Sequence, residues 1–345
     1  MKPPVFVYLD ETPGETRAII RDEVGYQYFL TQFEDDIPQY RLGARSVGRV
    51  RRIEPDLKGV FIDLGEEGGG DAFLPSQGGQ RLHEGEKVGV EVVSERREMK
   101  GVTLKLLGKA DGEPRLLTPG PTVTEWLGRL APGVEPVEGV RAIEAGWDAL
   151  READGQPFLG GDVSVTVERT RALIAVDFDY RPLPGRRASP QDRLEANRKG
   201  LRRAAQTIRL RSLGGLAAID LIGVGQDGGA ILKAAKAAFG NDPGIVYGPV
   251  NRFGVLMIAL PWRFTPLAER LYRGSQVYWP HRAAIEVTRK LRHALLSDTT
   301  TARVTARCTR QVAELAAPLV ARLGPRAHLK GDDSLRTSEH VIEAE

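Results

Sequence analysis

Two apolar runs, each with an aspartate near its end and a long arginine-rich segment between them, constrain the fold of this chain most. The runs are ALIAVDF (172–178) and LAAIDLIG (216–223), and both have the length and composition of buried strands. Between them, Ser189 and Pro190 mark the start of a helix and Gly214-Gly215 its end. Strand–helix–strand units are right-handed and hold their strands parallel. The sequence therefore predicts two parallel strands joined by a crossover helix.

The carboxylates of Asp177 and Asp220 are the first candidates for a functional site. Each lies near the carboxyl end of its strand, so one edge of the sheet should carry both, and strand alternation puts Asp179 on the same face as Asp177. Aspartates inside apolar runs are costly unless they are paired or bind a cation, and magnesium prefers one or two carboxylates together with water and phosphate. The pattern thus favours a metal site. The alternative is that Asp220 caps a turn or pairs with an arginine such as Arg209.

The chain as a whole predicts a mixed α/β fold with five segments. Residues 1–41 hold short strands, and residues 42–108 hold five strand-like runs that suit a small closed barrel. A linker and a short helical segment are expected over 109–160. The strand–helix–strand unit belongs to an α/β domain over 161–268. Residues 269–345 are expected to begin as a helix and to end in a small strand–helix–strand unit.

Composition and charge narrow the class of protein. No apolar stretch approaches the roughly 20 residues of a membrane span, and the N-terminus turns acidic too early for a secretory signal. The single cysteine, Cys308, excludes an internal disulfide framework and is expected to be a buried thiol. We therefore expect a cytoplasmic protein. Residues 181–211 contain ten Lys and Arg but only two acids, and four arginines cluster over 45–52. Together with other signals of nucleic-acid binding, these two basic clusters favour nucleic acid as a partner.

The run TIRLRSLGGLAAIDLI (207–222), which follows RALIAVDFD (171–179), resembles the catalytic signature of the ribonuclease E/G family. The resemblance implies a catalytic domain with ribonuclease H-like and DNase I-like elements, in which Asp177 and Asp220 bind Mg²⁺. It also implies a catalytic role for Asp179, at the position where the best-known members have an asparagine that orients the site.

The same resemblance suggests which side chains contact RNA. Arginines of the 186–211 region are expected to neutralise the substrate, Arg187, Arg209 and Arg211 among them. Asn197 stands where the family has a helix asparagine. The motif NRFG (251–254) resembles a family segment that leads into the last strand.

The barrel segment resembles the S-one RNA-binding domain, an OB-fold, through VGRVRRIEPDLKGVFIDLG followed by DAFLP. The resemblance implies that Phe61 and Phe73 stack on bases, that Lys100 contacts phosphate and that Arg49 belongs to a basic groove. The alternative for the two phenylalanines is that they fill the barrel core.

Several departures from the family affect the prediction. After RFG this chain has VLMIALPWR instead of a polar, arginine-bearing run, and Asp179 adds a negative charge. About 45 residues separate the barrel from the catalytic unit, too few for the sensor of a five-prime monophosphate, so equal turnover of phosphorylated and hydroxyl-ended RNA is expected. The cysteine pair that shares zinc between subunits is missing, so any homodimer is not bridged by zinc.

Three functions therefore stay open at the level of the sequence. The first is metal-dependent endonucleolytic cleavage of single-stranded RNA, which yields five-prime phosphate and three-prime hydroxyl ends. The second is a non-catalytic protein that binds single-stranded RNA. The third is an interaction module that acts on the ribosome or on another nuclease.

Overall fold

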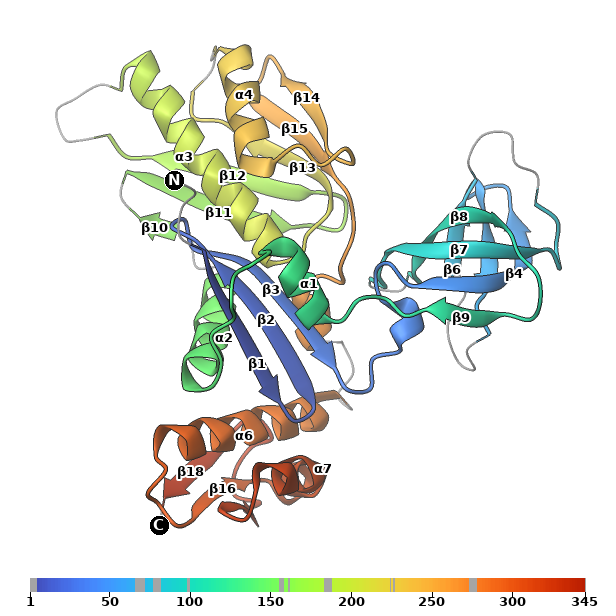
Figure 1. Cartoon of the computed structure of the whole chain (residues 1–345). Coiled ribbons are helices and arrows are strands. Elements are labelled where there is room, and N and C mark those ends of the chain that lie inside the picture. The colour runs from blue at the N-terminus through green and yellow to red at the C-terminus, as the bar shows by residue number, and fades with distance from the viewer. Residues whose placement is uncertain are drawn as a thin grey trace. The chain divides into compact units, whose positions relative to one another are not determined.

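The computed structural model of the chain describes residues 5–65, 72–76, 82–97, 100–154, 158–160, 162–182, 188–223, 225, 227–272 and 278–344. Helices and strands are mixed along these ranges (Figure 1). The chain divides into two compact units. The first consists mainly of Arg21–Phe29 and Asp148–Arg263, and the second consists of Phe6–Ile20, Leu30–Trp147 and Phe264–Glu345. No helix of the described residues is long and apolar enough to span a membrane.

A mixed sheet forms the centre of the first unit. Its strands among the described residues lie in the order β10 (Phe158–Gly160), β11 (Val163–Arg169), β12 (Ile174–Tyr180), β13 (Gly215–Asp220), β15 (Val255–Leu260) and β14 (Val246–Val250). The neighbours β12 and β13 are parallel, as the sequence predicts, and the other neighbours are antiparallel. The crossover helix α3 (Pro190–Leu210) connects β12 with β13.

Two helices cover one face of this sheet, α3 and α4 (Gly228–Phe239) (Figure 1). Helix α3 begins as predicted, with a capping box formed by Ser189 and Asp192. At the start of α4, the side chain of Asp227 accepts two backbone N–H groups. The core beneath them is apolar and includes Val176, Phe178, Leu201, Ile219, Ile231, Leu256 and Ile258. A Cβ on Gly200 would come within 2.7 Å of the Phe178 ring, so only glycine lets α3 pack this closely.

A closed barrel belongs to the second unit. It consists of β4 (Arg45–Glu54), β5 (Gly59–Asp63), β6 (Ala72–Pro75), β7 (Lys87–Ser94) and β8 (Thr103–Lys109). These strands pair in the order β5-β6-β8-β7-β4, and an additional β4–β5 pairing closes the ring. Its core is built from the alternate apolar residues of each strand. Five strands close as the sequence predicts.

The segment predicted to be a linker contains more regular structure than expected. Residues Arg115–Thr118 form strand β9, which pairs with β4 at the edge of the barrel. The prediction of a linker was wrong there, because backbone pairing with β4 does not require the β-branched pattern from which a strand is recognised. Helices α1 (Val123–Leu130) and α2 (Val140–Ala153) follow. Helix α2 confirms that the segment 109–160 contains a helix.

The second unit also holds most of the N-terminal three-stranded sheet, β1 (Phe6–Thr12), β2 (Glu15–Arg21) and β3 (Tyr26–Phe33), together with α5 (Leu267–Tyr272) and α6 (Tyr278–Ser297). Its last part contains β16 (Val304–Cys308), α7 (Arg310–Val320), β17 (Ala327–Gly331) and β18 (Val341–Ala344). Strands β16 and β17 are parallel around α7, which confirms the predicted terminal unit. Cys308 is buried, as expected.

A buried ionic network fixes α6 to the N-terminal strands. The guanidinium of Arg289 donates to Asp10 at 2.7 Å, to Glu15 at 2.7 Å and to Glu286 at 2.8 Å, and Arg17 pairs with Glu15 at 2.9 Å. Burial alone would raise the pKa of Glu15, but Arg17 and Arg289 hold it well below its usual range. Loss of one partner would leave a buried charge unpaired, so this network is sensitive to substitution.

Candidate functional site

Four residues on neighbouring strands form a row across the sheet of the first unit. Thr166 on β11 is the register partner of Asp177 on β12, Asp177 is the partner of Asp220 on β13, and Asp220 is the partner of Val255 on β15. We call these four residues the aspartate row. Register partners point to the same face, and paired strands lie about 4.8 Å apart. The carboxylates of Asp177 and Asp220 are therefore neighbours on one face.

The two aspartates of this row are exposed, while the residues that precede them in each strand, Val176 and Ile219, are buried under α3 and α4. This corrects the expectation that Asp220 is enclosed by its apolar neighbours: the alternation of the strand turns the carboxylate to the opposite face. Among the described residues, neither Asp177 nor Asp220 has a hydrogen-bond or ion-pair partner. The alternative, in which Asp220 pairs with Arg209, is also not observed among these residues, because Arg209 donates to Gln27 and Ala238.

Asp179 lies two residues beyond Asp177 on the same face and is the register partner of Ser164. Its carboxylate is 3.7 Å from the guanidinium of Arg181, and both side chains are exposed. The described residues contain no group of three or more potential metal-ligating His, Cys, Asp or Glu side chains. The donor set on this face is thus the pair Asp177 and Asp220, which suits a hard cation that keeps several waters.

Asn197 positions the chain just after β13. It is fully buried; its amide oxygen accepts the N–H of Ile222 at 2.8 Å, and its amide nitrogen donates to the Ile222 carbonyl at 3.2 Å. The structure therefore contradicts the expectation that Asn197 contacts RNA. The side chain instead holds the backbone two residues after Asp220.

Arg209 and Arg211 are also structural. Arg209 donates to the side chain of Gln27 at 2.6 Å and to the carbonyl of Ala238 at 2.9 Å, and burial lowers its pKa. Arg211 donates to the carbonyls of Ala153 and Val167, each at 2.7 Å. Both side chains are partly buried, and these donors tie elements of the first unit together, so their role as RNA contacts stays a prediction. Arg187 lies outside the described residues.

The remaining charges of α3 are largely paired. Arg198 and Arg202 lie 3.3 and 3.9 Å from the carboxylate of Glu195, and Lys199 lies 3.0 Å from Asp162. Exposed pairs of this kind contribute little stability, but they lower the net positive charge of the helix face. The sequence count of basic residues therefore overstates the charge that this helix offers to RNA.

On the barrel, Phe61 and Phe73 lie side by side on the outside. They are register partners on β5 and β6, their ring centroids are 5.5 Å apart, and both are partly exposed. The core of the barrel is formed by other residues, which contradicts the alternative that these rings fill it. A Cβ on Gly59 would come within 2.3 Å of the Phe73 ring, so glycine makes room for it.

Arg52 completes this surface; the sequence placed it in a basic cluster but did not reveal its position beside Phe61. Its guanidinium carbon lies 4.7 Å from the centroid of the Phe61 ring, at cation–π distance. A register shift between Val50 and Arg52 brings Arg52 opposite Phe61. Simple alternation along RVRRI does not reveal such a bulge. We call Arg52, Phe61 and Phe73 the barrel platform.

The other two predicted RNA contacts of the barrel lie at the surface. Arg49 is exposed and pairs with Asp63 at 2.9 Å. The pKa of Asp63 is lowered, chiefly by the backbone N–H of Gly65. Lys100 is exposed, and its backbone pairs with that of Arg97. Both side chains lie at the surface of the protein.

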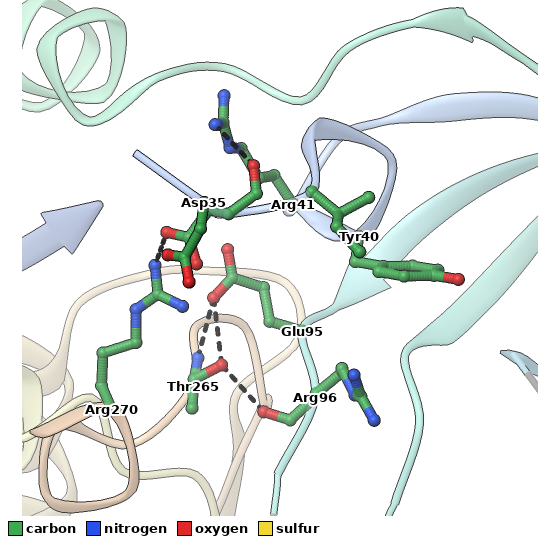
Figure 2. A pocket seen from close by; sticks show the side chains of 9 residues that line it. Asp35, Tyr40, Arg41, Glu95, Arg96, Thr265 and Arg270 are labelled. Carbon is green, nitrogen blue, oxygen red and sulfur yellow. Dashed lines mark hydrogen bonds and ion pairs between the residues drawn. The ribbon is translucent and has the colours of Figure 1, made fainter. Parts of the chain in front are cut away.

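A small polar cavity of 110 Å³ lies elsewhere in the second unit (Figure 2). Its lining includes Asp36, which pairs with Arg270, and Glu95, which accepts the backbone N–H of Thr265 at 3.0 Å. Asp36 and Glu95 thus each have partners within the protein. We assign it no ligand.

Comparison of the chain with known proteins gives no match: no protein-family model matches it, and no curated protein is significantly similar to it in sequence.

Proposed function

We propose that the protein is a magnesium-dependent endoribonuclease that cuts single-stranded RNA. The observation that carries the proposal is the register pairing of Asp177 with Asp220, which gives two exposed carboxylates on one face of a sheet, neither of them paired with any residue that the structure describes. Two such groups repel each other, and a divalent cation bound between them relieves that repulsion.

In this proposal Asp177 and Asp220 hold the ion at the face of the sheet, and Asn197 fixes the backbone that follows Asp220. When bound, magnesium supplies a more acidic water and a positive charge beside the scissile phosphate. The products are five-prime phosphate and three-prime hydroxyl ends, as the resemblance to the ribonuclease E/G family implies. Asp179 lies on the same face and adds negative charge beside the pair.

We further infer that the barrel is an OB-fold of the S-one type and grips the RNA. Its strand order, in which the third and fifth barrel strands, β6 and β8, pair in parallel, supports this inference. The barrel platform offers two rings and a guanidinium to unpaired bases, and stacking of this kind contributes roughly 1–3 kcal/mol per base. Arg49 and Lys100 are the phosphate contacts in this account.

A second function, binding of single-stranded RNA without cleavage, is favoured by the strand next to Asp220. Val255 and Met257 on β15 share the face of the aspartate row and are apolar, so this neighbour offers no polar side chain to a substrate phosphate. A protein without these phosphate contacts would lose cleavage but would still bind single-stranded RNA through the barrel.

One experiment separates the two functions. Labelled single-stranded RNA is incubated with the protein in magnesium or in chelator, with Asp177→Asn, Asp220→Asn and Glu168→Gln. Glu168 is a matched control, because it is an exposed carboxylate on the same sheet face, opposite Ala175. We expect magnesium-dependent cutting by the wild type and Glu168→Gln, and none by either aspartate variant. Cutting by a clean Asp220→Asn protein would refute the site. Binding without any cutting by the wild type would favour the second function.

A further inference from the structure

The turn between β14 and β15 carries an exposed aromatic ring. Phe253 is 67% exposed, and the guanidinium carbon of the preceding residue, Arg252, lies 4.8 Å from its ring centroid. Arg252 has no ion pair with any described residue. Most phenylalanines are buried, since burial of such a side chain contributes about 1.5–3 kcal/mol. The exposed Phe253 ring forgoes this free energy, and its exposure beside a guanidinium points to a ligand that covers it.

Four hydrogen bonds hold the backbone of this turn. The side-chain oxygen of Asn251 accepts the N–H groups of Phe253 at 2.9 Å and of Val255 at 3.0 Å. The backbone of Asn251 pairs with Val255 and Gly254, each at 3.0 Å. Gly254 adopts a φ of +84°, which glycine allows without strain. The ring is thus presented by a pre-organised loop, and a ligand that stacks on it need not order the backbone.

The turn lies next to the aspartate row. Val255 is the register partner of Asp220, and the N–H of Leu221 donates to the carbonyl of Gly254 at 3.3 Å. Phe253 is two residues from Val255, so its Cα lies within about 12 Å of the Cα of Asp220. A nucleotide that neighbours one held at the aspartate row falls within this reach.

We propose that Arg252 and Phe253 form a subsite for an unpaired nucleobase next to the phosphate held at the aspartate row. The inference rests on the proposed function and adds to it a positioning subsite separate from the barrel platform. The free face of the Phe253 ring stacks on the base, and the donors of Arg252 that face solvent bind an adjacent phosphate. A protein partner fits less well, because one ring beside a cation is far smaller than a docking surface.

The test uses the full chain and a single-stranded oligoribonucleotide with one cut site. One abasic nucleotide is placed at each position beside the cut in turn. Cleavage is measured as kcat/KM in magnesium, and affinity is measured by fluorescence anisotropy in chelator at the same salt. The variants are Phe253→Ala, Phe253→Trp and the control Val246→Ala, which alters an apolar side chain on β14 that is 64% exposed.

We expect Phe253→Ala to lower kcat/KM by roughly 5- to 150-fold on intact RNA. The same loss is expected for the wild type at one abasic position, with no added loss when both changes are combined. Phe253→Trp should retain activity, and Val246→Ala should match the wild type. Wild-type cutting that is unchanged in Phe253→Ala would overturn the subsite and leave the nuclease standing. No cutting by the wild type, with weaker binding by Phe253→Ala in chelator, would overturn the nuclease and support the subsite. Binding that is equal in all variants, without cutting, would refute both.

Discussion

Replacement of Asn197 by alanine distinguishes a structural from an RNA-binding role for this side chain. The change removes two hydrogen bonds to the backbone of Ile222, at 2.8 and 3.2 Å, from a side chain with no solvent exposure. Each such bond contributes a net 0.5–1.5 kcal/mol or so, which gives a local loss of about 1–3 kcal/mol. The segment that follows Asp220 should therefore open more often.

Hydrogen exchange followed by mass spectrometry measures this opening directly. Peptides that cover 215–223 should exchange roughly 5- to 150-fold faster in Asn197→Ala, which is the same free energy expressed as a rate. Affinity for single-stranded RNA in chelator should stay within about twofold of the wild type, because phosphate and stacking contacts elsewhere carry it. Gln191→Ala is a matched control, since Gln191 is an exposed amide side chain on the same helix. Weaker RNA binding by Asn197→Ala with unchanged exchange over 215–223 would refute the structural role.

Three further predictions concern the barrel, the core and the ionic network. Alanine at Phe61 or at Phe73 should weaken binding of single-stranded RNA by roughly 5- to 150-fold in anisotropy titrations; equal affinity would remove the barrel platform from the account. Gly200→Ala should destabilise the protein by about 1–3 kcal/mol in urea unfolding, because its Cβ would overlap the Phe178 ring; unchanged stability would contradict the close packing. Glu15 has a folded-state pKa below its usual 4.5, so the stability it contributes is present above pH 4.5 and is lost as the pH falls below it. The free energy of unfolding should therefore depend less on pH over this acid range in Glu15→Gln than in the wild type. An equal pH dependence in the two proteins would show that Glu15 does not cause the loss of stability in acid.

The parallel strands and their crossover helix were predictable because local signals agree with the global fold. Ser189 and Pro190 start α3 as the sequence indicates, and alternation along β12 and β13 sets which residues face the core. The same alternation put the carboxylates of Asp177 and Asp220 on the open face, a consequence that their apolar neighbours obscured.

The arginines show why the remainder of the site was not predictable. A count of basic residues does not say which guanidinium groups turn inward, and Arg209 and Arg211 donate to backbone carbonyls of segments distant in sequence. The bulge that aligns Arg52 with Phe61 and the turn that exposes Phe253 likewise depend on pairing between strands. These features follow from tertiary contacts and not from composition or periodicity.

Titration of a divalent ion into the protein tests the central claim most directly, which is that Asp177 and Asp220 share one cation. Calorimetry with Mg²⁺, and electron paramagnetic resonance with Mn²⁺ in its place, should detect a site in the wild type and in Glu168→Gln. That site should be lost in Asp177→Asn, in Asp220→Asn and in the double variant alike, since two ligands of one ion are not additive. Full retention of the site in either single variant would show that the two carboxylates do not act together.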